Sequence, residues 1–318
     1  MPTIYAGPGK VYINSVALQP EGVNGPVKIE LVEERKQIAA ALFGQIGNNL
    51  VDQYVNLTVS PFDNWGLIGT LFPPRIGVTS AAGTANLQIG SRAHATAVAA
   101  GTHCKVWKPD GVLYDIVLAA VWGHPSLKLG TGQPLFGEAK IMGVGDPSKS
   151  MGASGYLIDS NAITESAAAD PGGQMTMSDF IRGKWTASWG SVTGFTGMEA
   201  EEFWTIETDA QYSQLKVQGR TIGTKVDSIS FMAKGRPYGP THTQIMGIVG
   251  GHTHGQRLGQ YDLVFTGPSS KTITLHKSEL VGAGFEFGGT TLGTGEIGFV
   301  TEMNFTAGVS GPLMTFSS

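Results

Sequence analysis

The sequence is poor in charge and in cysteine, and each shortage excludes a class of protein. Charged residues make up 14% of its 318 residues, against roughly 25% in an average soluble domain. The formal net charge is −4, so the chain lacks the basic excess with which proteins grip nucleic-acid phosphates. Cys104 is the only cysteine, so no disulfide can form within the chain. We expect Cys104 to be a small buried residue rather than a nucleophile.

Long apolar runs and catalytic signatures are also missing. No run of about 18 apolar residues could form a transmembrane helix. The N-terminal MPTIYAGPGK has no basic region followed by an apolar run, so it does not read as a secretory signal. There is no G-x-S-x-G motif, and GVGDPS at 143–148 lacks the third glycine of a dinucleotide fingerprint. We therefore expect no enzyme activity, no cofactor and no membrane contact.

Two local patterns suggest ligand sites but are incomplete. Gly7, Gly9 and Lys10 resemble a phosphate loop, but the next residue is Val11, where magnesium binding needs Ser or Thr. The stretch 10–18 instead predicts two short strands around a turn. The sequence HTH at 252–254 puts two histidines on one face of an extended segment, with His242 ten residues before the first of them, but no cysteine or acidic residue lies close. We expect a solvated loop there, and no metal.

Glycine and proline are plentiful and predict the fold class. The 46 glycines and 16 prolines show no collagen period, so they favour many strands joined by tight turns. Apolar alternation predicts strands at 27–32, 51–60, 92–99, 103–108, 112–121 and 135–142. Residues 33–45 fit a short helix, or a continued strand followed by a long loop. Asn64 and the prolines at 73 and 74 bracket one short buried helix.

Short segments of the first half of the chain recur in the second half, and they recur in the same order. The separations are about 163 to 177 residues, too long for a solenoid repeat, so each copy should be a domain. We predict a first domain at 1–145, a linker or inserted loop at 146–179, and a second domain at 180–318. The matched segments are Gly9-Lys10 with Gly183-Lys184, Ile46-Gly47 with Ile222-Gly223, Val51-Asp52 with Val226-Asp227, NWGLIGTLF with THTQIMGIV, and LGTG at 129–132 with LGTG at 292–295.

The chain resembles the tail tube (major tail) proteins of long-tailed bacteriophages, most clearly over about residues 7–75 and only faintly in its second half. The resemblance is carried by GKVYINSVALQPEG, then VKIELVEE, then GNNLVDQYVNLTVSPFDNWGLIGTLFP. It implies a mainly β fold: two homologous β-sandwich or rolled-sheet tube domains, each with one short helix. Six such domains make a ring in this family, so three two-domain chains would give pseudo-six-fold symmetry. Stacked rings would form the hollow tube through which DNA passes without specific binding.

The same resemblance implies partners and sites. The chain would bind copies of itself and the tape measure, tail terminator and tail-tip proteins, and would be assembled in the host cytoplasm into the virion tail. Loops near 39–50 and 208–225 would reach the next ring. The assembly candidates are Leu42, Phe43, Gln45, Ile46, Gln214, Leu215 and Val217. Acidic candidates for the tube lumen, where carboxylates would repel DNA over a Debye length of ~8–10 Å, are Glu30, Glu33, Glu34, Glu202 and Glu207.

Two other interpretations stay open. The chain could be a related ring protein of the tail tip or baseplate, which would also assemble into a ring. It could also be a carbohydrate-binding β-sandwich protein, since six tryptophans and eight tyrosines could supply stacking platforms. A tube protein predicts two equivalent domains, whereas a sugar-binding module predicts an aromatic cluster on one set of loops.

Overall fold

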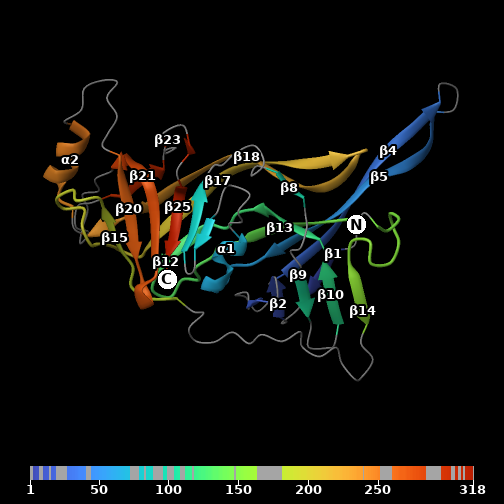
Figure 1. Ribbon diagram of the computed structural model, residues 1–318, viewed down its shortest axis with the longest axis horizontal. Helices are drawn as coiled ribbons and strands as arrows, with labels where there is room; N and C mark the ends of the chain where they lie inside the picture. The colour runs from blue at the N-terminus through green and yellow to red at the C-terminus, as the bar shows by residue number, and fades with distance from the viewer. Residues whose placement is uncertain are drawn as a thin grey trace.

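A computed structural model shows a mainly β protein whose strands form several antiparallel sheets, which confirms the predicted fold class (Figure 1). Two long hairpins dominate its outline, and one of them projects beyond the rest of the molecule. The residues that the structure describes are 3–6, 10–13, 16–18, 27–40, 44–71, 79–81, 84–88, 96–98, 104–107, 112–116, 118–146, 148–162, 181–238, 240–250, 260–283, 295–301, 305–306, 309–310 and 312–317.

The first half of the chain contributes two five-stranded sheets. One has the order β1 (Thr3–Ala6), β4 (Val27–Ala40), β5 (Gly44–Val59), β13 (Ala139–Val144) and β11 (Ala119–Gly123). The other has the order β14 (Asp159–Ala162), β10 (Val112–Ile116), β9 (Cys104–Trp107), β2 (Lys10–Ile13) and β3 (Val16–Leu18). Apolar side chains from both sheets belong to one core, so the arrangement is sandwich-like.

The second half is built mainly into a larger sheet. Its path runs β12 (Leu127–Gly130), β17 (Phe203–Val217), β18 (Arg220–Gly235), β22 (Ile297–Thr301), β21 (Thr272–Ala283), β20 (Tyr261–Thr266), β15 (Thr186–Trp189), β16 (Met198–Ala200) and β19 (Pro237–Tyr238). β25 (Pro312–Ser317), β6 (Thr79–Ala81), β7 (Thr84–Gln88) and β8 (Thr96–Val98) join it off this path, and β23 (Phe305–Thr306) pairs with β24 (Val309–Ser310).

A short helix follows each long hairpin, as the sequence predicts. After β5, η1 (Trp65–Leu67) leads into α1 (Ile68–Leu71), and the Asn64 side chain accepts a hydrogen bond from Gly66 N–H at 2.9 Å. After β18 comes α2 (His242–Gly250). A separate turn, η4 (Pro268–Ser270), connects β20 and β21. Among the described residues, no helix has the length and hydropathy needed to cross a bilayer.

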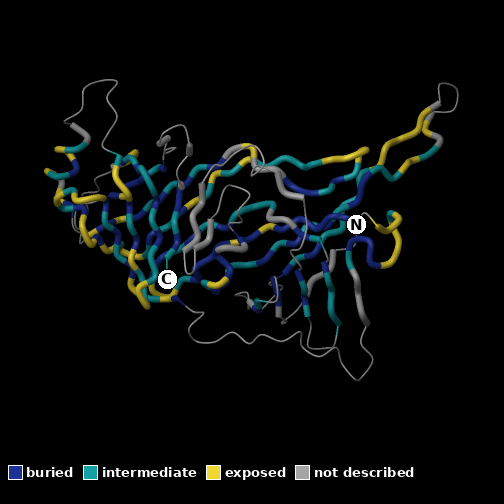
Figure 2. Tube along the Cα trace, viewed as in Figure 1, coloured by how far each residue is buried: buried dark blue, intermediate teal, exposed yellow. Residues whose placement is uncertain are grey.

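The core of the first half follows from the alternation of its strands. Val55, Leu57 and Val59 of β5 are completely buried, whereas the residues between them are only half-buried (Figure 2). Successive side chains of a strand point to opposite faces, so one face of β5 packs inward. Each such side chain contributes about 1.5–3 kcal/mol by leaving water. Cys104 lies in the same core, as expected, and burial raises the pKa of its thiol to about 12.

The two long hairpins carry the same irregularities. In β4–β5 the extra residues of two β-bulges are Val51 and Ile46. In β17–β18 they are Asp227 and Ile222, with the same spacing between them. The predicted match of Ile46-Gly47 with Ile222-Gly223 therefore agrees with strand register. The predicted match of Val51-Asp52 with Val226-Asp227 is displaced by one residue, because the bulged residue Val51 corresponds to the bulged residue Asp227.

The neighbours of the hairpins are also arranged alike. β13 and β11 follow β5 in the first sheet, and β22 and β21 follow β18 in the larger one. Trp122 is the extra residue of a bulge between β11 and β13, and Val281 occupies the same place between β21 and β22. The two hairpins therefore have the same order of neighbouring strands and a bulge at the same place in the outer pair.

Several predicted boundaries differ from the structure. The helix alternative for 33–45 is wrong, because β4 continues to Ala40 and β5 begins at Gly44. The strand predicted at 112–121 is two strands, β10 and β11. The strand predicted at 135–142 begins at Ala139, because Phe136 forms isolated bridges with Phe62 and Leu127 instead. Within the segment 146–179, residues 159–162 form β14, which pairs with β10.

A buried carboxylate joins the helix region of the first half to the start of the second. Asp63 accepts hydrogen bonds from Leu135 N–H at 2.7 Å and from Arg182 Nε at 2.5 Å, and its side chain is 1% exposed.

We expect Asp63→Ala to lower the free energy of unfolding by about 1–3 kcal/mol, because the buried Leu135 N–H loses its acceptor. Urea unfolding of the variant would measure this. Glu138→Ala is the control, since Glu138 is exposed and should change stability by less than about 0.5 kcal/mol. Equal midpoints for the two variants would contradict the assignment.

Candidate assembly surfaces

The predicted assembly residues cluster at the ends of the two hairpins. The loops expected at 39–50 and 208–225 are mostly strand: their residues form the distal parts of β4–β5 and β17–β18. Gln45 is exposed, Gln214 and Leu215 are half-buried, and Val217 is 54% exposed. Ile46 lies in β5 as a bulged residue. Leu42 and Phe43 lie outside the described residues.

The two hairpin ends are in different surroundings. β4 beyond residue 34 is exposed up to residue 39, and Figure 1 shows this end of β4–β5 projecting away from the sheets. Among the described strands, residues 31–40 of β4 and 44–53 of β5 pair only with each other. The end of β17–β18 instead lies against the first half, and β8 pairs with residues 223–225. One hairpin is therefore docked and the other projects.

A buried polar junction fixes the docked hairpin. Asp52 of β5 is fully buried and accepts hydrogen bonds from Thr221 N–H at 3.0 Å and from the Thr221 hydroxyl at 2.5 Å. Lys216 Nζ lies 2.6 Å from Glu34 and 3.5 Å from Asp52. The hydrogen bond from Lys216 to Glu34 raises the pKa of this lysine, and the nearby Asp52 carboxylate acts in the same direction.

Aromatic contacts extend the junction. The Tyr212 ring packs on Trp122 with centroids 5.8 Å apart and stacks on His124 at 5.5 Å. The Tyr212 hydroxyl accepts a hydrogen bond from His124 N–H at 2.9 Å, and burial raises the pKa of this phenol, so it stays neutral. Arg220 donates a hydrogen bond to the Tyr156 hydroxyl at 2.7 Å and lies over that ring. The docked hairpin therefore combines apolar packing with directional bonds.

The acidic lumen candidates are mostly paired. Glu30 forms an ion pair with Lys28, Glu33 with Arg35, Glu34 with Lys216 and Glu207 with Lys234. The hydrogen bonds from Arg35 and Gln53 hold the pKa of Glu33 below its ordinary value.

These candidates do not share one face. Glu30 and Glu34 lie on one face of β4, whereas Glu33 lies on the other, because side chains alternate along a strand. A single bore cannot receive all three carboxylates of β4 from the same side of the sheet.

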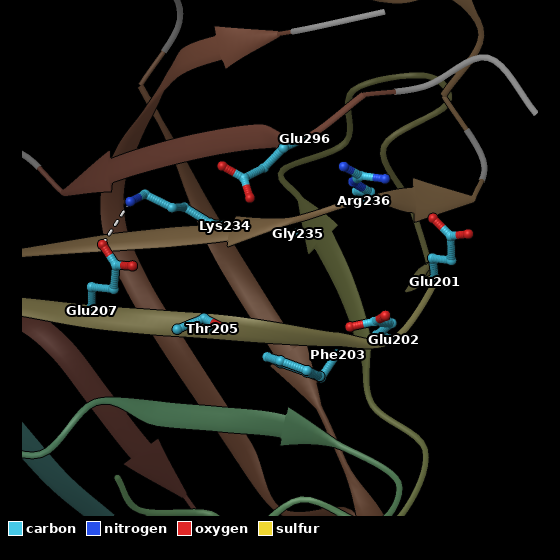
Figure 3. A pocket seen from close by; sticks show the side chains of 9 residues that line it. All are labelled: Glu201, Glu202, Phe203, Thr205, Glu207, Lys234, Gly235, Arg236 and Glu296. Atoms are coloured by element: carbon cyan, nitrogen blue, oxygen red, sulfur yellow. Dashed lines mark hydrogen bonds and ion pairs between the residues drawn. The ribbon is translucent and has the colours of Figure 1, made fainter. Parts of the chain in front are cut away.

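Glu202 lines a charged cavity of about 370 Å³ beside the base of the second hairpin (Figure 3). Carboxylates of Glu201, Glu207 and Glu296 and the cations of Lys234 and Arg236 also line it, and Glu207 pairs with Lys234 at 2.7 Å. Within the part of the chain that the structure describes, no three His, Cys, Asp or Glu residues are placed to hold a metal ion. His242 begins α2, whereas residues 252 and 254 of the histidine pattern lie outside the described residues.

The junction between Asp52 and Thr221 was not predicted from the sequence. Asp52 appears in the sequence as one polar residue of an alternating strand, and only contact with Thr221, 169 residues later, buries it. A usable signal was the run of two polar residues, Asp52 and Gln53, inside a strand that otherwise alternates. Both are buried.

Comparison with known proteins adds no identity. No protein-family model matches this chain, and no curated protein sequence matches it.

Proposed function

We propose that the protein is a structural component of a bacteriophage tail, which assembles through its long hairpins into stacked rings and so forms the tail tube. The observation that carries the proposal is the pair of long hairpins, one docked on the chain's own first half and one projecting with exposed strands. The 16 residues of β5 span about 50 Å at roughly 3.3 Å per residue. That reach suits contact with another copy of the chain.

The matching strand order of the two halves supports a ring of three chains. A contact between unlike surfaces closes into a ring if the rotation fits, and stacks into a filament if rings meet head to tail. In this proposal the halves are duplicated tube domains, so each chain supplies two of six similar units. The low charge content of 14% favours broad protein–protein contact over an isolated, highly solvated monomer.

The burial of the aromatic residues supports this proposal over a sugar-binding module. Trp185, Trp189 and Trp204 are at most 4% exposed, so they fill the core and offer no stacking platform. Of the described tyrosines, Tyr238 and Tyr261 are among the most exposed, and they belong to different strands, β19 and β20.

The passage of DNA requires a bore that does not bind phosphates. The ion pairs along β4 and β17 neutralise the lysines and arginines nearest to the acidic candidates. A strand surface of this kind presents few unpaired cations to DNA, so we propose that DNA passes without specific contacts. The tape measure, terminator and tail-tip proteins remain the proposed partners, and the virion tail the proposed location.

Sedimentation velocity over a wide concentration range tests the proposal. The chain has a mass of 33.4 kDa, so a closed ring of three chains should appear near about 100 kDa and grow into larger stacked species as concentration rises. A single 33.4 kDa species up to the highest soluble concentration would contradict the proposal.

A further inference from the structure

The contact inside the chain shows how the end of one long hairpin fits on the base of the other. The end of β17–β18 lies on the base of β4–β5 and on β11, through Lys216 with Glu34, Thr221 with Asp52, and Tyr212 with Trp122. These are contacts between unlike surfaces: a hairpin end on one side and a hairpin base on the other. In a closed ring of similar units, each such contact recurs at every junction.

Strand register identifies which residues correspond. Because the bulges fall at equivalent places, Ala39 of β4 corresponds to Lys216 of β17, and Arg35 corresponds to Tyr212. On the receiving side, Gln211 corresponds to Glu34. Val281, the bulged residue of β21, corresponds to Trp122 of β11.

The corresponding residues on both sides of a contact between copies are exposed to solvent. Ala39 and Arg35 are exposed on the projecting hairpin. Gln211 is exposed on the receiving side, and Val281 is 51% exposed, one of the few large apolar side chains that are so accessible in the described part of the chain. The second half therefore exposes an apolar residue at the position where the first half has Trp122 covered by Tyr212.

We propose that the β4–β5 hairpin of one copy docks on the second half of another copy, with Ala39 beside Gln211 and Arg35 over Val281. The occupant is a second copy of this chain, and the inference rests on the proposed ring assembly. The aliphatic stem of Arg35 covers the apolar Val281 while its guanidinium stays in water. In this arrangement the projecting hairpin contacts a lateral neighbour within the same ring, in place of the next ring that the family resemblance implied.

The junction inside the chain and the junction between copies differ in their charged residues. The junction inside the chain has a buried carboxylate and a lysine, Asp52 and Lys216. At the junction between copies, Gln45 corresponds to Thr221 and Ala39 to Lys216, so neither the lysine nor its ion pair is repeated. The contact inside the chain is therefore the stronger one, and the contact between copies forms only on assembly.

Cross-linking with a short bismaleimide tests this arrangement. In the chain carrying Ala39→Cys and Gln211→Cys, we expect links between copies that join up to three chains and no more, because the ring closes. The native Cys104 does not interfere, since its buried thiol has a pKa raised to about 12 and stays protonated.

Three controls define the result. A chain with Lys216→Cys and Glu34→Cys carries the equivalent pair inside one copy, so it should react without gaining mass in denaturing gels. This control shows that the reagent is long enough to link two cysteines across such a contact. The single variants Ala39→Cys and Gln211→Cys should give no trimers.

The outcomes separate the inference from the proposed function. Three-chain products from the Ala39→Cys, Gln211→Cys chain support the docking. Rings or tubes seen by electron microscopy without such products would overturn the docking while leaving the tube proposal in place. Absence of any assembly, with a chain that stays at 33.4 kDa in sedimentation, would overturn both.

Discussion

A chain whose first hairpin is shortened is expected to fold normally and to lose assembly. Replacing residues 36–49 by Asn-Gly would join Arg35 to Leu50, which face each other in the β4–β5 ladder, through the two-residue turn that suits antiparallel strands. The removed residues contribute nothing to the described core. We expect the threshold concentration for assembly to rise by at least about 100-fold, equivalent to about 2.7 kcal/mol of lost contact energy.

Sedimentation velocity and circular dichroism of the shortened chain would measure both parts of this prediction. The matched variant replaces residues 213–225 by Asn-Gly, which joins Tyr212 to Val226 in the β17–β18 ladder. That change removes Lys216 and Thr221 from the internal junction, so it should lower the melting temperature, whereas the first change should not. Assembly of the β4–β5 variant at wild-type concentrations would contradict the role assigned to the projecting hairpin.

Asp52→Ala should be strongly destabilising. The substitution leaves the N–H and hydroxyl of Thr221 without their buried acceptor and removes a carboxylate 3.5 Å from Lys216. It also removes the acceptor of the Gln53 N–H. Each buried donor left without a partner costs about 1–3 kcal/mol, so we expect a loss of about 2–4 kcal/mol in the free energy of unfolding.

A double-mutant cycle would locate this loss at the junction. Thr221→Val removes the hydroxyl donor alone and should cost about 1–2 kcal/mol, and combining it with Asp52→Ala should cost clearly less than the sum. Asp209→Ala, on the exposed face of β17, is the control and should change stability by under about 0.5 kcal/mol. Additive losses at Asp52 and Thr221 would show that the two side chains do not depend on each other.

Local patterns predicted those parts of the fold that depend on local physics. The two short strands β2 and β3, the alternation of Val55, Leu57 and Val59, and the Asn64 cap all depend on neighbouring residues, and the structure has each of them. The turn predicted between β2 and β3 lies outside the described residues. The continuation of β4 through EERKQIAA could not be settled, because those residues suit a helix by propensity. Pairing with β5 decides in favour of the strand.

The junction could not be predicted because it depends on contacts between distant residues. Glu34, Asp52 and Lys216 each read as ordinary polar surface residues. Their roles appear only when the end of β17–β18 is placed on the base of β4–β5, 182 residues away along the chain in the case of Lys216 and Glu34. The predicted counterparts near 39–50 and 208–225 were expected to be loops, and the sequence did not show that one forms a docked hairpin end and the other a projecting one.

Negative-stain electron microscopy of the purified full chain, from dilute to the highest soluble concentration, tests the central claim most directly. The account predicts rings with a central hole, whose averaged views show six similar lobes, and stacking of these rings into hollow tubes at high concentration. Particles that stay single and lack a central hole over the whole range would contradict it.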